Sequence, residues 1–184
     1  MPKSQKQNIS LKMTAAMAML VAISIILGKY LAISLGNVLR LSLENLPILF
    51  AGLAFGPLQA LLVAVTADVI GCILVGYEIN PIVTIGAAAI GVVAGALPKL
   101  LKKHAKLNGA PLIIITVAAS HVIGSVLIKT LGLAVFYDMP IMILMLWRLL
   151  NYTIVSVIEA LLLYVLLKRD GIRKQIEKIK QKSN

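Results

Sequence analysis

Charged and polar side chains interrupt the apolar stretches of this chain at spacings that bring them together on helix faces. His121, Ser125 and Lys129 are each four residues apart, and Arg148 and Tyr152 are four apart in the next stretch. Residues four apart share one face of a helix. A charge at membrane depth costs at least about 2.5 kcal/mol on insertion scales, so it normally faces a partner or a wet cavity. The pattern predicts two polar helix faces that close on each other around a ligand.

The predicted ligand pocket collects polar residues that lie toward one end of the apolar stretches. Lysine and arginine can hold carboxylates, arginine with bidentate geometry. The alternative for any single member is a structural ion pair, such as Asp68 with Lys29 or Lys129. Glu159 falls toward the opposite end of its stretch. The predicted substrate-binding residues are Lys29, Arg40, Glu44, Asn45, Asp68, Tyr77, Asn80, His121, Lys129, Arg148, Asn151 and Tyr152.

The elements that position these residues are predicted to be membrane-spanning helices. Hydrophobic residues make up 60% of the 184 residues, and mean hydropathy is +0.97, well above a soluble domain. Only helices and closed barrels satisfy their own backbone in lipid, and the apolar stretches are continuous rather than alternating. The fold class is therefore an all-α membrane protein with six spans, the second of them short: Met13 to Leu35, Leu43 to Phe55, Leu58 to Gly76, Pro81 to Leu101, Leu112 to Val135 and Ile141 to Leu167.

The lysines and arginines that flank these spans predict the orientation. They gather before the first span, after the fourth and after the sixth, whereas the other loops hold Arg40, Glu44, Glu78 and Asp138 without such an excess. Because positive charge marks cytoplasmic loops, both termini are predicted to be cytoplasmic and the polar pocket to face outside. The chain divides into a basic arm (1–12), a membrane domain (13–167) and a basic tail (168–184).

Several other functions are disfavoured by the same residues. The net charge of +11 lies beside the spans, where topology and anionic lipid explain it better than nucleic acid. Cys72 is the one cysteine, and His104 and His121 lie far apart, so no metal site is expected. An intramembrane enzyme could use His121 with Ser125, but no acid is placed to orient the histidine. A self-sufficient secondary transporter would need inverted repeats, and none is visible.

Two further features suggest surfaces that act with the pocket. The loop Ser34 to Ser42 is apolar except for its arginine, so it either folds inward over the pocket or forms an interfacial strand. Thr14, Ala18 and Ala22 place one small residue on each turn of the first span, and such stripes let another helix approach closely in lipid. They are the predicted docking residues for a membrane partner.

The run LRLSLENLPILFAGLAFGP, from Leu39 to Pro57, resembles the substrate-capture S components of energy-coupling factor (ECF) vitamin transporters. Six predicted spans in a short chain and the AxxxA stripe of Ala18 and Ala22 are similar as well. The folate-specific branch is the most similar, with an arginine-containing loop before a second helix that carries a proline and ends in AG and then FGP. The matching residues are Arg40, Pro47, Ala51-Gly52, Phe55-Gly56-Pro57, Ala67-Asp68, Gly71 and Asn80-Pro81.

The resemblance implies a high-affinity vitamin-binding S component of an ATP-driven importer in a bacterial plasma membrane, and no enzyme or cofactor. Such a subunit captures its vitamin outside and docks through its first helices onto a membrane T component coupled to two ATPase subunits. Folate is favoured, because cations can hold its glutamate carboxylates while acids or amides read its pterin edge. Hydroxymethylpyrimidine, pyridoxine and pantothenate remain open, as does a self-sufficient secondary transporter.

Overall fold

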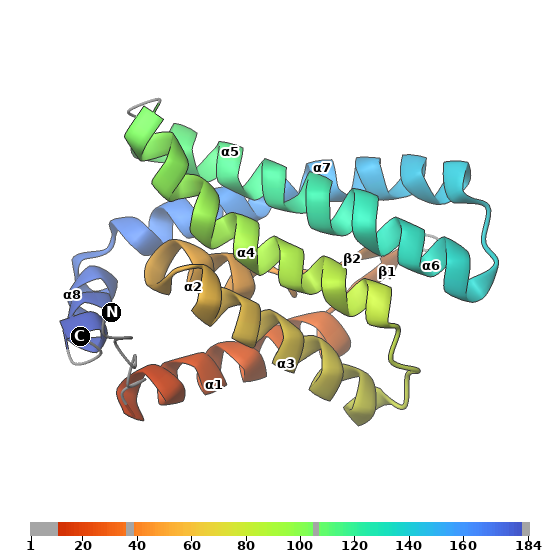
Figure 1. Cartoon of the computed structure of the whole chain (residues 1–184), viewed down its shortest axis with the longest axis horizontal. Helices are drawn as coiled ribbons and strands as arrows, with labels where there is room; N and C mark the ends of the chain where they lie inside the picture. Colours follow the sequence, from red (N-terminus) through yellow and green to blue (C-terminus); the bar gives the residue numbers. More distant parts are fainter. Residues whose placement is uncertain (1–10, 36–38, 105–106, 182–184) are drawn as a thin grey trace, which may run out of the picture.

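The computed structural model describes residues 11–35, 39–104 and 107–181 (Figure 1). Nearly all of them are helical, with two segments of π-helix (η1 and η2) and two short strands. The elements are α1 (Leu11–Ile25), η1 (Ile26–Tyr30), β1 (Ile33–Leu35), β2 (Leu39–Leu41), α2 (Leu46–Phe55), α3 (Pro57–Val75), α4 (Pro81–His104), α5 (Ala110–Ser120), η2 (His121–Ile128), α6 (Lys129–Tyr137), α7 (Ile141–Lys168) and α8 (Asp170–Gln181).

Five helical segments among the described residues are long and apolar enough to cross a membrane. They correspond to the predicted first, third, fourth, fifth and sixth spans, and they identify a helical membrane protein. The segments are Leu11–Tyr30, Pro57–Val75, Pro81–Lys103, Ala110–Tyr137 and Ile141–Lys168.

The predicted second span is the ten-residue helix α2. At 1.5 Å per residue it is about 15 Å long, half of the roughly 30 Å hydrocarbon core. It begins at Leu46 rather than Leu43, because β2 and a turn occupy the residues before it. Six spans therefore remain a prediction, with α2 as the segment in question.

Glycine and proline set the sharp connection between α2 and α3. Gly56 has a φ of +114°, a conformation that side-chain-bearing residues rarely adopt, and its N–H bonds to the carbonyls at the end of α2. Pro57 then opens α3 at its first turn, where the missing N–H costs nothing. The two helices can therefore reverse direction across one residue.

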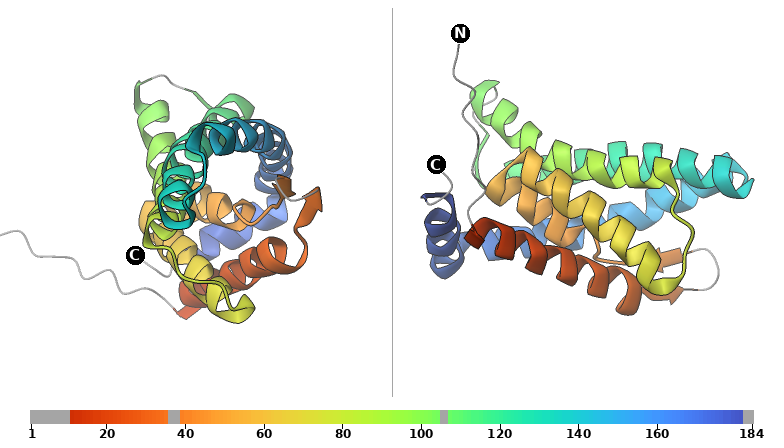
Figure 2. Two further views of the ribbon diagram at one scale, coloured as in Figure 1. Left: turned by 90° about the vertical axis from the view of Figure 1, so that its right-hand side faces the viewer. Right: turned by 60° about the horizontal axis from the view of Figure 1, so that its bottom comes forward.

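One half of the bundle is a dry, close-packed core. It joins the start of α1, most of α2, the first half of α3, the middle of α4, α5 and the later part of α7. Helix α4 lies centrally, packing against α2, α3, α5, η2 and α6 (Figures 1 and 2). A Cβ on Gly95 would overlap the backbone of Gly56 and Pro57, and one on Gly91 would overlap Ala60. These glycines let α4 touch α3 backbone to backbone.

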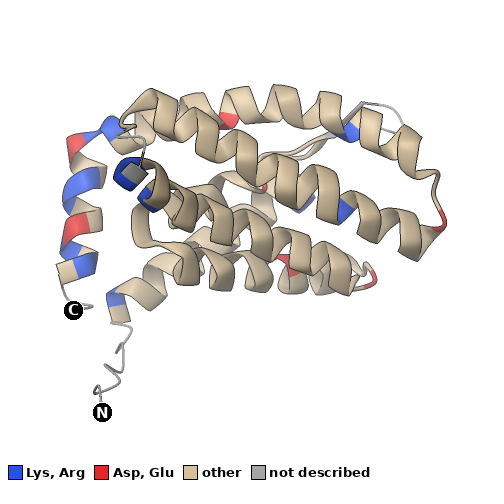
Figure 3. Cartoon of the chain, turned by 45° about the horizontal axis from the view of Figure 1, so that its top comes forward, with Lys and Arg blue, Asp and Glu red and all other residues tan. Residues whose placement is uncertain are grey.

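The described chain begins and ends at the same end of the bundle, here called the basic end. Helix α8 lies across it, and lysines and arginines gather on α8 and on the helix ends beside it (Figure 3). The loops at the opposite end, here called the pocket end, carry Glu78 and Asp138. This arrangement places the two flanks of the described chain on one side, as the charge pattern requires.

Two elements differ from the expectations drawn from the sequence. The first span ends at Tyr30 rather than Leu35, because β1 and β2 form an antiparallel hairpin that pairs Ile33 with Leu41. The hairpin adds a small strand pair to the all-α class, and β2 packs beside α7. In the basic tail, α8 is a helix whose Ile179 packs against the core.

Candidate functional site

A polar cavity of about 470 Å³ opens at the pocket end, among η1, α3, α6, α7 and the loop that precedes α4. Nine of the twelve predicted substrate-binding residues line it: Lys29, Glu44, Asp68, Tyr77, Asn80, Lys129, Arg148, Asn151 and Tyr152. Asn45 and His121 lie behind its wall. The side chain of Arg40 lies outside the described residues, although its backbone forms part of β2.

Both π segments carry a lysine to the cavity. Lys29 lies within η1, and Lys129 caps the end of η2. An extra residue per turn shifts the face that a helix presents, and such segments are frequent at functional sites. Lys29 lies over the ring of Tyr77, with its Nζ 5.5 Å from the ring centroid. The π geometry thus coincides with the places where the two lysines reach the cavity, whereas Arg148 reaches it from the regular helix α7 (Ile141–Lys168).

Lys129 and Glu44 form an ion pair across the cavity wall, with Nζ and Oε1 3.3 Å apart. Gly86 of α4 makes room for the lysine stem, since a Cβ there would overlap Lys129 Cγ. Ser24 fixes the other side of the pair by donating from Oγ to the Glu44 carbonyl at 2.6 Å. One cation of the cavity therefore already has a carboxylate partner on the protein.

Asp68 does not form the lysine pair that was the structural alternative. Among the described residues, the ion pairs within 4.0 Å join Lys129 to Glu44 and His121 to Glu159. Asp68 instead accepts a 2.6 Å hydrogen bond from the Thr84 hydroxyl. Its carboxylate lines the cavity with acceptor capacity left for a ligand.

The side chains of Asn80 and Asn45 differ in the hydrogen bonds that they form within the protein. The Asn80 amide donates to the Gly132 carbonyl at 2.8 Å, and its Oδ1 accepts from Ile82 N–H at 3.0 Å, capping α4. Both of its polar atoms therefore serve the protein. Asn45 is fully buried and its amide atoms have no hydrogen-bond partner. It borders a small space of about 20 Å³ beneath the main cavity, beside Lys129.

Two lining residues of α6 were not predicted. Tyr137 adds aromatic surface beside Trp147, and Leu133 lies between Lys129 and Tyr137. The spacing of four from Lys129 to Leu133 to Tyr137 continues the predicted polar face by two more turns. That signal was available in the sequence.

His121 belongs to a buried network behind the cavity. Its Nε2 lies 2.5 Å from Glu159 Oε2, and its Nδ1 lies 3.2 Å from Ser125 Oγ. The expectation that no acid orients this histidine is wrong, because α7 places Glu159 against it. His121, Ser125 and Glu159 are each at most 1% exposed, so no substrate reaches them in this arrangement.

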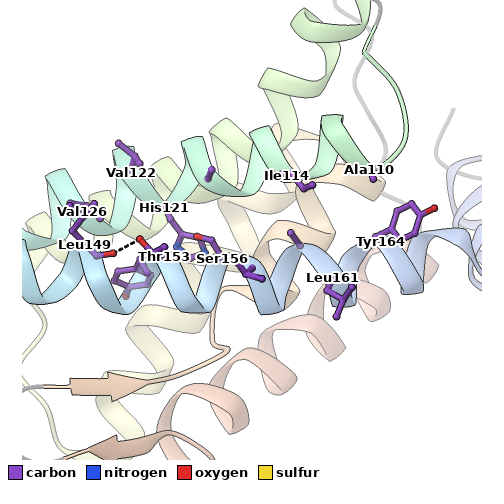
Figure 4. Close-up of a pocket in the computed structure, with 14 residues that line it drawn as sticks. Ala110, Ile114, His121, Val122, Val126, Leu149, Thr153, Ser156, Leu161 and Tyr164 are labelled. Atoms are coloured by element: carbon purple, nitrogen blue, oxygen red, sulfur yellow. Dashed lines mark hydrogen bonds between the residues drawn. The ribbon is translucent and has the colours of Figure 1, made fainter.

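A second hollow lies between α5–η2 and α7, on the outside of the bundle (Figure 4). This lateral groove of about 620 Å³ is lined mostly by apolar residues, including Ile114, Val122 and Leu161. Tyr152 lines both the groove and the polar cavity, while His121 lines only the groove. The two spaces are therefore separated by a thin wall of side chains.

The small residues of α1 and those of α4 lie in two different settings. Thr14, Ala18 and Ala22 are all exposed on α1, so that face is open to another helix. Gly91 and Gly95 on α4 are buried against α3 instead. No group of three metal-ligating side chains occurs among the described residues.

Comparison with known proteins identifies the setting of this site. Residues 12–167 match the family described as ECF transporter, substrate-specific component. Among solved structures, the chain is similar to the crystal structure of FolT bound with folic acid, at a TM-score of 0.66 and 22% identity, over 84% of this chain and 90% of that one. At this identity the likeness shows a shared fold. No curated protein sequence matches the chain.

Proposed function

The chain belongs to the family of substrate-specific components of ECF transporters, and we propose that its polar cavity captures folate. The observation that carries this proposal is the cavity of about 470 Å³, which combines cations, acids and aromatic rings at one end of the bundle. Its volume lies within the range of sites for small-molecule ligands. The solved structure with a similar fold contains folic acid.

The charges of the cavity suggest how folate would lie. Glu44 already pairs with Lys129, so Arg148 and Lys29 are the better placed cations for the two carboxylates of the glutamate tail. Asp68, hydrogen-bonded only on one side to Thr84, is the acid that would read the paired donors of the pterin. The rings of Tyr152 and Trp147 would flank the flat pterin and benzoyl groups.

The proposed topology places the basic end in the cytoplasm of a bacterial cell and the cavity outside. Six spans result if α2 and the preceding hairpin together count as the second crossing, with both termini cytoplasmic. Supporting this arrangement, the basic residues of α8 lie at the end of the bundle opposite Glu78 and Asp138. The arm 1–12 and the tail 168–184 would then flank the membrane domain 13–167 on the inner side.

The proposed partners are a membrane T component and two ATPase subunits. The exposed stripe of Thr14, Ala18 and Ala22 is the proposed docking face, because small side chains let a partner helix approach closely. This stripe lies toward the basic end, away from the cavity. A partner can therefore bind it while the vitamin is held.

Fluorescence titration of the purified protein tests the ligand. Trp147 is the one tryptophan and lines the cavity, so a ligand that fills the cavity will change its emission. Folate is expected to quench it at low concentration. Hydroxymethylpyrimidine, pyridoxine and pantothenate serve as competitors, and tight binding of one of them without folate binding would replace folate as the vitamin.

A matched pair of ligands tests the proposed pose. Arg148→Ala should weaken folate by roughly tenfold to a hundredfold or more, because it removes charged hydrogen bonds to the tail. A pterin without the glutamate tail should lose little. Equal losses for the two ligands would contradict the assignment of Arg148 to the carboxylates.

A further inference from the structure

Three side chains form a stack that runs from the cavity wall into the protein. The Tyr152 ring contacts both the Arg148 guanidinium, whose Cζ is 5.2 Å from the ring centroid, and the His121 imidazole, which is stacked on it with the centroids 4.9 Å apart at 27°. Arg148 and Tyr152 line the polar cavity, whereas His121 does not. The histidine is therefore the layer behind the two residues that a ligand touches.

Hydrogen bonds and ring stacking join the same residues into a closed circuit. Arg148 Nε donates to the Ser125 carbonyl at 3.0 Å, the Ser125 hydroxyl contacts His121 Nδ1 at 3.2 Å, and Arg148 Nη2 donates to the Tyr152 hydroxyl at 3.5 Å. With these N–H groups occupied, Nη1 and the second N–H of Nη2 are left as the donors for a carboxylate. The circuit thus selects which edge of the guanidinium remains for a ligand.

Glu159 anchors the back of the stack. It is fully buried on α7, two turns from Tyr152, and its Oε2 holds His121 Nε2 at 2.5 Å. Its Oε1 has no hydrogen-bond partner among the described residues, so within that part of the chain His121 is the group that compensates for burying this carboxylate. Burying such a pair costs free energy of desolvation. Removing one partner strongly destabilises the protein, because the other charge is then buried alone. His121 of this pair stacks on Tyr152, which lines the cavity.

Tyr152 needs support from this side because of what lies beyond it. The lateral groove reaches Tyr152 and His121 from the outside of the bundle (Figure 4). Without the imidazole, the space behind the Tyr152 ring would join the groove. The Tyr152 ring could then rotate away from Arg148, and the guanidinium would lose the ring on which it stacks.

We propose that His121, anchored by Glu159, is a positioning residue that holds Tyr152 and, through it, the guanidinium of Arg148 in place for a carboxylate of the ligand. This inference deepens the proposed function and rests on it, because it assigns Arg148 to the tail of folate. It predicts that residues outside the cavity control recognition of the tail and leave recognition of the pterin unchanged.

Two double variants test the stack without leaving a charge buried alone. His121→Leu with Glu159→Leu removes both members of the pair and the aromatic layer. His121→Phe with Glu159→Leu also removes the pair but keeps an aromatic ring against Tyr152. Thr153→Val is the matched control, since Thr153 lines the same groove and its hydroxyl bonds only to Leu149 of its own helix.

Affinity for two ligands is the first measurement. The leucine double variant should bind folate about tenfold or more weaker, as expected for loss of an aligned charged hydrogen bond, while a pterin without the tail binds within about threefold of wild type. The phenylalanine double variant should recover most of the folate affinity. Equal losses for the two ligands, unchanged folate affinity in the leucine double variant, or no recovery with phenylalanine would each overturn the proposal.

The Arg148 Nε–H resonance in ¹⁵N-labelled protein is the second measurement, and it needs no ligand. Identified by its loss in Arg148→Lys, this signal should exchange slowly with water in wild type and in the phenylalanine double variant, and rapidly in the leucine double variant. Unchanged exchange in the leucine double variant overturns the positioning role. If wild type fails to bind folate, the folate proposal fails, and the exchange rates still decide whether His121 positions Arg148.

Discussion

The two ends of this bundle differ in what their helices enclose. At the basic end, small residues bring helices into backbone contact, as where Gly95 of α4 meets Pro57 of α3. At the pocket end, Gly132 still brings α6 close to Ile82 and Val83 of α4, but the helices as a group surround a cavity of about 470 Å³ that is lined by Lys129, Glu44 and Asp68. The apolar core reaches from the start of α1 to the end of α7 but not to the cavity.

This contrast shows how the chain keeps charged groups at membrane depth. Each charge in the cavity reduces the gain from packing there, so the helices must be held together elsewhere. The close-packed core holds the helices together through dispersion contacts and close helix approach, which are the main attractions between helices in lipid. The pocket end is then free to keep polar groups partly unpaired for a ligand.

The largest effect should follow from forcing apart two helices of the close-packed core. Gly95→Leu places a side chain where even a Cβ overlaps the backbone of Gly56 and Pro57, so α4 and α3 must separate. Overpacking of this kind costs about 3 kcal/mol or more. The variant should aggregate or elute as a broad species in size-exclusion chromatography, with ligand binding lost together with the fold.

Gly171→Leu is its control, because a Cβ at Gly171 in α8 meets nothing within 4 Å. It should purify and bind like wild type. A well-folded Gly95→Leu protein with normal binding would contradict the view that the basic end supports the pocket end.

The next largest effect should separate the docking face from the cavity. Ala18→Trp fills the exposed stripe on α1 with a bulky ring, which blocks close approach of a partner helix. Uptake of folate by cells that hold the T component and ATPases should be abolished, while folate affinity of the isolated protein stays unchanged. Ala22→Trp should behave in the same way.

Val165→Trp provides a bulky residue on another lipid-facing surface, since Val165 is exposed on α7. It should leave uptake intact. Uptake by wild type in cells without any partner subunit would instead indicate a self-sufficient transporter.

An intermediate effect is expected at the acid of the cavity. Asp68→Asn keeps the size of the side chain and an acceptor for Thr84 but removes the charge that would read the pterin. Folate affinity should fall about tenfold or more, since hydrogen bonds to charged groups contribute about 1.5–3 kcal/mol. The protein should remain monodisperse.

Thr84→Val removes the hydroxyl partner and leaves the carboxylate, so it should change folate affinity much less. Aggregation of Asp68→Asn, with full affinity in the surviving fraction, would show that Asp68 supports the fold instead.

Most of the spans were predicted from the sequence, because continuous apolar stretches are local signals. Pro81 begins its helix as predicted, and α3 begins at Pro57, one residue before the predicted Leu58. Helix α8 was missed, although Ile172, Ile176 and Ile179 follow helical spacing among its charges. Its charged composition resembled a solvated tail.

The pairings within the site were much less readable. The spacing of four residues places His121 and Lys129 on one helix face. It does not show that the two side chains contact different partners. Glu159 reaches His121 across 38 residues, and Glu44 reaches Lys129 across 85. Such contacts depend on how α7 and α2 pack, which the pattern within a single helix does not encode.

The smallest expected effect concerns α8 at the basic end. Partial burial lowers the pKa of the Lys180 ammonium from its ordinary value, and the neighbouring Lys102 and Lys99 lower it further. The unfolded chain therefore holds more protons than the folded one between the lowered and the ordinary pKa, so this lysine makes stability rise with pH across that window.

Lys180→Met should flatten the rise and, below the window, raise the thermal midpoint by about 1–2 °C, the scale of a surface substitution. Lys174→Met, at another exposed position of the same helix, is the control and should leave the pH profile unchanged. A Lys180→Met profile identical to wild type would show that α8 does not press this lysine against the basic end.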